Sequence, residues 1–230
     1  MVEIIEESVF FGAAISLVAY EFGLILKKKF KLAIFNPLLI AIICVIGVLN
    51  VLDVDYETYN EGGRYISYLL TPATVCLAVP LYQQLQLLKK NIKAVAAGII
   101  SGVLASLVSI LVFAKLFGLS HEQYVTLLPK SITTAIGMGV SEELGGIVTI
   151  TVAVIIITGV LGNMIADVVY KVAKIEEPVA KGLALGTSAH AIGTAKAMEL
   201  GQVEGAMSSL AIAVAGLLTV IAASFFAGFA

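Results

Sequence analysis

The feature that most constrains the fold is a series of apolar runs, each long enough to cross a lipid bilayer and separated from the next by a short charged loop. A helix needs about 20 apolar residues to span ~30 Å of hydrocarbon. The chain is 60% hydrophobic and 13% charged, with a mean hydropathy of +1.04, and this composition excludes an ordinary soluble domain. We therefore predict an all-α polytopic membrane protein that forms a single membrane domain over residues 1–230.

We expect about seven spanning helices and one re-entrant segment from the lengths of the apolar runs. The expected spans are residues 9–26, 34–52, 65–88, 94–117, 147–170, 178–200 and 205–229. Loops 27–31 and 89–93 carry lysines and loop 53–61 is acidic, so the first two are placed in the cytoplasm and the third outside. This order puts the amino terminus outside and the carboxyl terminus in the cytoplasm. The first ten residues lack the basic region of a signal peptide, so the first span is expected to be retained.

The segment 127–146, LPKSITTAIGMGVSEELGG from Leu128 onwards, is long enough to span but is rich in polar residues. If it dips into the membrane and returns, Lys171 and Lys174 fall in the cytoplasm. If it crosses, the same lysines fall outside. The preference of lysines for the cytoplasm favours the re-entrant interpretation.

The stretch from Leu183 to Gly201, LALGTSAHAIGTAKAMELG, is too polar for an ordinary membrane helix. Polar groups at membrane depth are costly unless protein or water satisfies them, so they usually line a cavity. Gly186 and Gly193 would allow the helix to unwind there. Two interpretations are open: a discontinuous helix at a solute site, or a close helix crossing that uses small residues around a hydrogen-bonded core histidine.

A second interruption is Thr71-Pro72, where a threonine N-cap and a proline in the first turn predict the start of a half-helix. The free amides of Ala73 and Thr74 would then face an anion. The alternative is a simple proline kink. Each interrupted segment is the middle member of a trio of spans, and the two trios, about residues 34–117 and 147–229, run in opposite senses, which is typical of secondary transporters.

Hydroxyls, cations and free amides within these interrupted segments are the candidate solute-binding groups, because a small carboxylate needs charge compensation and directional donors. They are Thr71, Ala73, Thr74, Lys130, Ser131, Thr133, Thr134, Thr187, Ser188, His190, Thr194 and Lys196. Glu142 and Glu143 are candidates for a coupling proton or sodium ion, or else belong to a solvated loop. Lys130 could equally extend to the membrane interface, and the hydroxyls could bond to helix carbonyls. His190 could relay a proton or lie satisfied in the core.

Other function classes find little support in the sequence. The charge balance, 14 basic against 16 acidic residues, indicates no nucleic-acid partner. Cys44 and Cys76 have no metal-ligand spacing, and we expect neither a metal nor a cofactor. Ser188 and His190 would point to different faces of a helix and no catalytic motif is present, so an enzyme is not expected. Small residues in 94–106 would permit close helix packing in a dimer or within the chain.

Several of these stretches together resemble the LrgB/CidB family of bacterial membrane proteins. They are PATVCLAVPLYQQ, LPKSITTAIG, SEELGG and KGLALGTSAHAIGTAKAMELGQVEGAMSSLAI, and the similarity covers about residues 36–217. Many family members have a proline after the paired threonines, where this chain has Ala135, which argues against a sharp kink at that point. The family was first described as antiholin-like and holin-like proteins that control murein hydrolases and cell lysis.

The resemblance implies a location in the bacterial plasma membrane and two alternative functions. The family includes the membrane domain of the plant plastid glycolate/glycerate translocator, and bacterial members are linked to pyruvate movement. This implies a transporter or facilitator of small monocarboxylates such as pyruvate, lactate, glycolate or glycerate. The alternative is a regulator of murein hydrolase export and lysis that acts with a small LrgA/CidA-type membrane partner.

Overall fold

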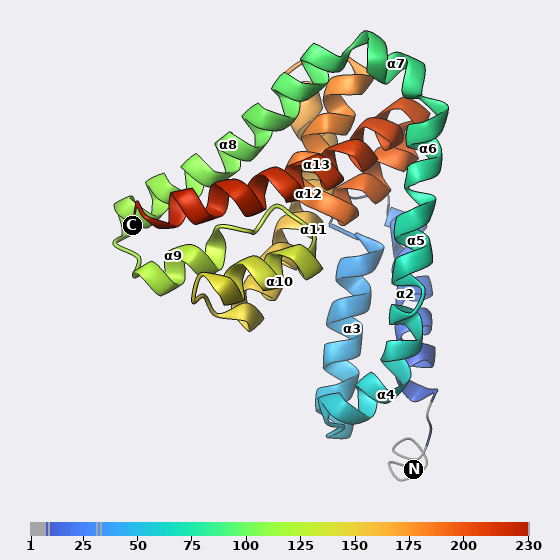
Figure 1. The fold of residues 1–230 in the computed structure, drawn as a ribbon. Coiled ribbons are helices and arrows are strands. Elements are labelled where there is room, and N and C mark those ends of the chain that lie inside the picture. Colours follow the sequence, from blue (N-terminus) through green and yellow to red (C-terminus); the bar gives the residue numbers. More distant parts are fainter. Residues whose placement is uncertain (1–7, 9, 31, 33, 230) are drawn as a thin grey trace. The chain divides into compact units, whose positions relative to one another are not determined.

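The described part of the chain is helical throughout and contains no strand, which confirms the predicted all-α fold (Figure 1). The computed structural model describes residue 8, residues 10–30, residue 32 and residues 34–229. The chain divides into two compact units, one up to Cys76 and one from Leu77 onwards. Each unit is considered separately below.

The first unit contains short and medium helices that pack through small residues. They are α2 (Phe11–Phe30), α3 (Pro37–Leu52), α4 (Tyr56–Ser67) and α5 (Leu70–Cys76). Asn36 caps α3 by accepting hydrogen bonds from the Leu38 and Leu39 amides, and Pro37 occupies the first helical turn. Gly23 of α2 lies against the Pro37 backbone, where an added Cβ would be 2.7 Å from the carbonyl oxygen. This close approach brings α2 and α3 together around Ala19, Ala41 and Val45.

The second unit holds most of the long apolar helices. Its helices are α6 (Ala78–Gln83), α7 (Leu85–Lys90), α8 (Ile92–Phe117), α9 (His121–Leu127), α10 (Thr134–Glu143), α11 (Val148–Val172), α12 (Pro178–Leu200) and α13 (Gln202–Ala227). By length and composition, α8, α11, α13 and the helical run Tyr56–Gln83 are able to cross a membrane, and α3 is a shorter apolar helix. The chain is therefore a polytopic membrane protein.

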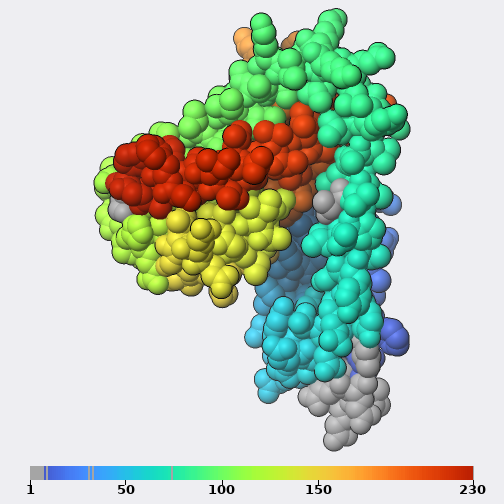
Figure 2. Space-filling view, viewed as in Figure 1, coloured from blue at the N-terminus to red at the C-terminus, as the bar shows by residue number. Residues whose placement is uncertain are grey.

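Residues 127–146 leave the end of α9, turn, and return to where they started. The Ile147 amide donates to Thr126 Oγ1 at 2.8 Å, so α11 begins beside the last turn of α9. The Thr151 hydroxyl donates to the Thr126 carbonyl at 2.9 Å, which strengthens the same junction. Figure 2 shows α10, in yellow, packed against α13, in red. A segment whose two ends meet in this way has the geometry that the re-entrant interpretation requires.

Helix α12 folds back on itself instead of crossing once, and in this it differs from the predicted single span over 178–200. Ala189 and His190 leave the helical conformation, with His190 at φ 41 and ψ −134. Gly193 returns beside Leu185, where an added Cβ would lie 2.6 Å from the Leu185 carbonyl oxygen. Positions eight apart on a straight helix would be separated by about 12 Å. We call residues 178–188 the first arm and 191–200 the second arm of this hairpin.

Both arms of α12 lie beside the same end of α11. Tyr170 donates its hydroxyl to the Lys181 carbonyl of the first arm at 2.9 Å. Asp167, one turn away, pairs with Lys196 of the second arm at 2.8 Å. The hairpin therefore begins and ends at the Val172 end of α11, and its tip reaches the middle of that helix.

This hairpin changes the direction of the last helix. Helix α13 starts at the Val172 end of α11, and near its own end the Phe226 carbonyl accepts a hydrogen bond from Tyr124 of α9 at 2.9 Å. It therefore runs parallel to α8 and finishes on the α9 side of the unit (Figure 1). The predicted cytoplasmic carboxyl terminus assumed that residues 178–200 form one straight span, and the side of the membrane on which this terminus lies stays a prediction.

The second unit consequently contains two hairpins that enter from opposite ends, each followed by a long helix. One is α9 with α10, followed by α11, and the other is α12, followed by α13. The larger inverted halves, 34–117 and 147–229, remain a prediction.

Candidate functional site

A groove of about 770 Å³ lies where the two hairpins approach α8. It is bounded by α8, the first arm of α12 and the turn between α9 and α10. The lining residues are Asn91, Ala94, Gly98, Ser101, Gly102, Ala105, Ser106, Ser109, Lys130, Ser131, Glu177, Val179, Ala180, Leu183, Ala184, Thr187 and Ser188. The groove thus brings together predicted site residues from two segments. Lys130 and Ser131 come from 127–146, and Thr187 and Ser188 come from α12.

Small residues on α8 allow the first arm of α12 to approach closely. A Cβ added at Gly98 would lie 2.9 Å from Leu183 Cδ1. At Gly102 it would lie 2.6 Å from Thr187 Oγ1. The small residues of 94–106 therefore pack against another helix of the same chain, and they also form one wall of the groove.

Lys130, Ser131 and Ser106 form a polar cluster in the groove. Lys130 Nζ donates to Ser131 Oγ at 3.0 Å and, at the longer distance of 3.4 Å, to Ser106 Oγ. Ser106 Oγ donates to Ser131 Oγ at 3.0 Å. Ser131 is buried and Lys130 is half-buried. Across the described residues, no carboxylate pairs with Lys130, so the cation has only hydroxyl partners.

A cation in this position favours an anionic ligand. Removing an ammonium group from water is costly unless an opposite charge or several hydrogen bonds compensate it. Hydroxyl oxygens stabilise the charge but do not neutralise it. The cluster can therefore bind a small anion by charge-assisted hydrogen bonds.

Thr187 and Ser188 also line the groove, but their hydroxyls bond to their own helix. Thr187 donates to the Leu183 carbonyl at 2.8 Å, and Ser188 donates to the Ala184 carbonyl at 2.6 Å. This is the usual way in which helical serine and threonine satisfy their hydroxyls in an apolar setting. Their binding role stays a prediction.

His190 and Thr194 hold the tip of the α12 hairpin in place. His190 is 3% exposed, and its Nε2 donates to the Ile155 carbonyl of α11 at 2.9 Å. Thr194 Oγ1 donates to the His190 carbonyl at 3.0 Å and shares a hydrogen bond with Ser208 Oγ at 2.7 Å. Gly159 leaves room for the imidazole, because a Cβ there would lie 2.7 Å from the ring. His190 is therefore a hydrogen-bonded core histidine, which is one of the two interpretations that the sequence left open.

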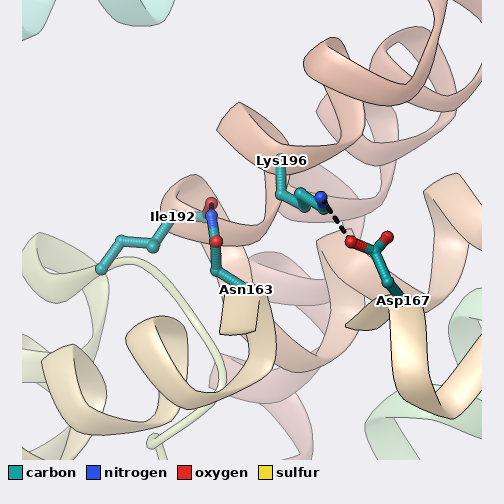
Figure 3. Close-up of polar contacts among 4 residues, drawn as sticks. All are labelled: Asn163, Asp167, Ile192 and Lys196. Atoms are coloured by element: carbon teal, nitrogen blue, oxygen red, sulfur yellow. Dashed lines mark hydrogen bonds and ion pairs between the residues drawn. The ribbon is translucent and has the colours of Figure 1, made fainter. Parts of the chain in front are cut away.

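Lys196 lies on the second arm at a distance from the tip and fastens this arm to α11 (Figure 3). Its Nζ is 2.8 Å from Asp167 Oδ2, and the Lys196 side chain is 15% exposed against 62% for Asp167. Asn163 donates to the Ile192 carbonyl at 3.1 Å, one turn nearer the tip. Lys196 is not among the residues that line the groove.

The other predicted residues of the second unit lie outside the groove lining. Thr133 is the N-cap of α10 without a side-chain capping bond, and it and Thr134 are half-buried. Glu142 and Glu143 are the last two residues of α10 and are exposed, and their role as coupling-ion ligands stays a prediction. Within the described ranges, no cluster of three metal-ligating side chains is present.

The interruption at Thr71-Pro72 differs in detail from the expectation. Helix α5 begins at Leu70, so Thr71 lies inside it, and the Ala73 amide donates to the Leu69 carbonyl at 2.9 Å. The prediction of a free amide at Ala73 is therefore wrong. The side chain of Thr74 lies outside the described part of the structure.

The sequence reasoning missed the α8 contribution to the groove. Ser101, Ser106 and Ser109 line it, as does Asn91 at the start of the helix. The sequence contains a signal for these groove residues, because small and polar residues recur at helical spacing along α8. The same spacing also indicates close helix packing, so it does not by itself identify a groove.

Long apolar helices and two hairpins define an α-helical multi-pass membrane protein, with a polar groove between α8 and the hairpins. The model of the LrgB-like family matches residues 16–229, and the chain belongs to this family. This confirms the resemblance seen in the sequence. Similar relatives include the Antiholin-like protein LrgB of Bacillus mycoides (strain KBAB4) and of Bacillus cereus (strain B4264), each 39% identical over 221 residues that cover 96% of both chains. No solved structure matches the chain.

Proposed function

We propose that this protein moves small monocarboxylates, of the pyruvate, lactate, glycolate or glycerate class, across the bacterial plasma membrane. The observation that carries the proposal is the convergence of two oppositely entering hairpins on one groove whose cation, Lys130, has no counter-ion among the described residues. Inverted segments with interrupted helices at the membrane midplane are the usual construction of secondary transporters.

Each arm of the α12 hairpin is long enough to reach only the middle of the membrane. The first arm contains residues 178–188 and the second 191–200, so each measures about 15 Å against ~30 Å of hydrocarbon. The tip at His190 would therefore lie near the midplane, and movement of a hairpin would expose a bound solute to one side at a time. Lys130 would compensate the charge of the carboxylate during this movement.

The test is uptake of labelled pyruvate, lactate, glycolate and glycerate into liposomes that contain the purified protein. We expect saturable uptake of at least one solute, above that of protein-free liposomes and responsive to a proton or sodium gradient if transport is coupled. Uptake that is unselective and does not saturate would indicate a passive pore. Absence of uptake for all four solutes from folded protein would refute the transport proposal.

A second candidate function is an antiholin-like regulator of murein hydrolase export and lysis, and it has more direct support from the names of the relatives. In this function the protein would assemble with a small LrgA/CidA-type membrane partner, or as a homo-oligomer, without moving a solute. Lysis control in cells should then survive Lys130→Ala and His190→Ala, provided that the variants reach the membrane. Loss of lysis control in parallel with loss of uptake would instead connect lysis to solute movement.

A further inference from the structure

The cluster of Lys130, Ser131 and Ser106 has more hydrogen-bond donors than acceptors. The Lys130 ammonium carries three N–H groups, and two of them point to Ser131 Oγ and Ser106 Oγ. Ser131 Oγ accepts from both Lys130 and Ser106, so both of its lone pairs are used. Its own hydrogen and the third N–H of Lys130 have no acceptor among the described residues. Two donors are thus free at adjacent atoms.

We infer that Lys130 Nζ and Ser131 Oγ form a two-donor cradle for one carboxylate and that Ser106 of α8 positions it. The two donor atoms are 3.0 Å apart, a spacing at which each can bond to one oxygen of the same carboxylate. Ser106 comes from a different helix and binds both groups, so it fixes the turn between α9 and α10 against α8. The inference rests on the proposed function for the class of solute and assigns the residues that bind it.

The charges along the groove select a monocarboxylate over a dicarboxylate. Among the described residues that line it, Lys130 is the only cation and Glu177 the only acid. Lys130 lies beside Ser106, whereas Glu177 lies at the start of α12 near Asn91, about 20 Å away along α8. A second carboxylate would find no cation among the described lining residues, and Glu177 at this distance would not offer one. One negative charge per solute molecule is therefore what this groove accommodates.

Equilibrium binding of labelled pyruvate to the purified full-length chain in detergent tests the cradle without requiring transport. Ser131→Ala should weaken binding roughly 10-fold and Lys130→Gln by about 100-fold, because each removes a hydrogen bond to a charged group and the latter also removes the charge. Lys130→Arg should restore part of the affinity. Ser106→Ala should weaken binding, whereas Ser106→Thr, which keeps the hydroxyl, should restore it. Unlabelled lactate should compete, and malonate and methyl pyruvate should compete far less.

One other groove serine provides a matched control. The Ser101 hydroxyl donates to the Gly98 carbonyl of α8 at 3.0 Å and does not contact the cluster, whereas Ser109 donates to the carbonyl of Ser106 itself at 2.8 Å. Ser101→Ala should therefore bind pyruvate like the unaltered protein. Thermal melting of every variant identifies any loss of folding.

The outcomes separate the cradle from the transport proposal. Unchanged pyruvate affinity in folded Lys130→Gln and Ser131→Ala, or no monocarboxylate binding at all, overturns the cradle. Binding as expected together with no uptake into liposomes overturns transport but leaves the cradle in place. Uptake that is insensitive to Lys130→Gln leaves transport in place and overturns the cradle.

Discussion

The hairpin in α12 can be tested by the side of the membrane on which its two ends are reached. The helix contains 23 residues, which as one straight span would measure about 35 Å and would place its ends on opposite sides. Folded at Ala189 and His190, it has two arms of about 15 Å, half of ~30 Å of hydrocarbon, and both ends lie on one side. Single cysteines at Glu176 and Leu200 should therefore react with a membrane-impermeant maleimide from the same side.

The assay uses vesicles of both orientations and a chain in which Cys44 and Cys76, its two native cysteines, are replaced by alanine. A cysteine at Glu122, in the first turn of α9, provides the reference for the opposite side, because α8 and α11 each separate it from α12 by one crossing. A reagent that reached Leu200 from the Glu122 side would have to pass the full ~30 Å of hydrocarbon. Labelling of Glu176→Cys and Leu200→Cys from opposite sides would refute the hairpin and restore the single span.

Two further perturbations test the packing and the capping of individual helices. Gly193→Leu should destabilise the protein by about 1–3 kcal/mol or more in thermal or denaturant unfolding, because any Cβ at this position meets the Leu185 carbonyl at 2.6 Å. Gly139→Ala should not destabilise the protein, because nothing lies within 4 Å of the added Cβ. Equal effects of the two variants would contradict the close approach of the arms. Hydrogen bonds from the Thr58 amide and hydroxyl lower the pKa of Asp55, the N-cap of α4, below its ordinary value of 3.8. A lowered pKa stabilises the fold above the ordinary value and loses this effect as pH falls through the folded value, so melting temperature should fall less steeply below pH 3.8 in Asp55→Asn than in the unaltered chain.

The apolar runs predicted the long helices well because span length and hydropathy are local properties of the sequence. The runs 94–117, 147–170 and 205–229 appear as α8, α11 and α13, with ends shifted by a few residues. The return of residues 127–146 could also be predicted from the sequence, because a re-entrant segment places Lys171 and Lys174 in the cytoplasm, as lysines prefer. Arguments from length and hydropathy count membrane crossings, however, and they do not show where the chain reverses direction within an apolar run.

The reversal in α12 was beyond these arguments because its length and composition fit either one crossing or two arms. The deciding feature is the backbone of His190, whose positive φ is uncommon for a residue with a side chain. It is maintained by the hydrogen bond of the His190 ring to the Ile155 carbonyl of α11 and by Thr194, which donates to the His190 carbonyl and bonds to Ser208 of α13. One part of each interpretation is observed, because the helix is discontinuous and its histidine is a hydrogen-bonded core residue, and a solute site at this break stays a prediction.

The binding cluster was predicted in part for a similar reason. Lys130 and Ser131 were conspicuous because a cation and a hydroxyl stood in an apolar segment. Ser106 was not, because a serine in a membrane helix usually bonds to its own backbone, and its partner Ser131 lies 25 positions away. A partnership of this kind depends on how the helices pack, and the sequence alone does not specify that packing.

The charge of half-buried Lys130 connects the two candidate functions, because in either function an anion or water must satisfy it in the groove. Lipid chains cannot satisfy an ammonium group and its serine partners at membrane depth. In a transporter the anion is the solute, and free monocarboxylate should compete for the site. In a regulator without a solute, water in the groove would satisfy Lys130. Lys130→Gln would then leave the complex with the partner and lysis control intact, whereas a transporter would lose uptake.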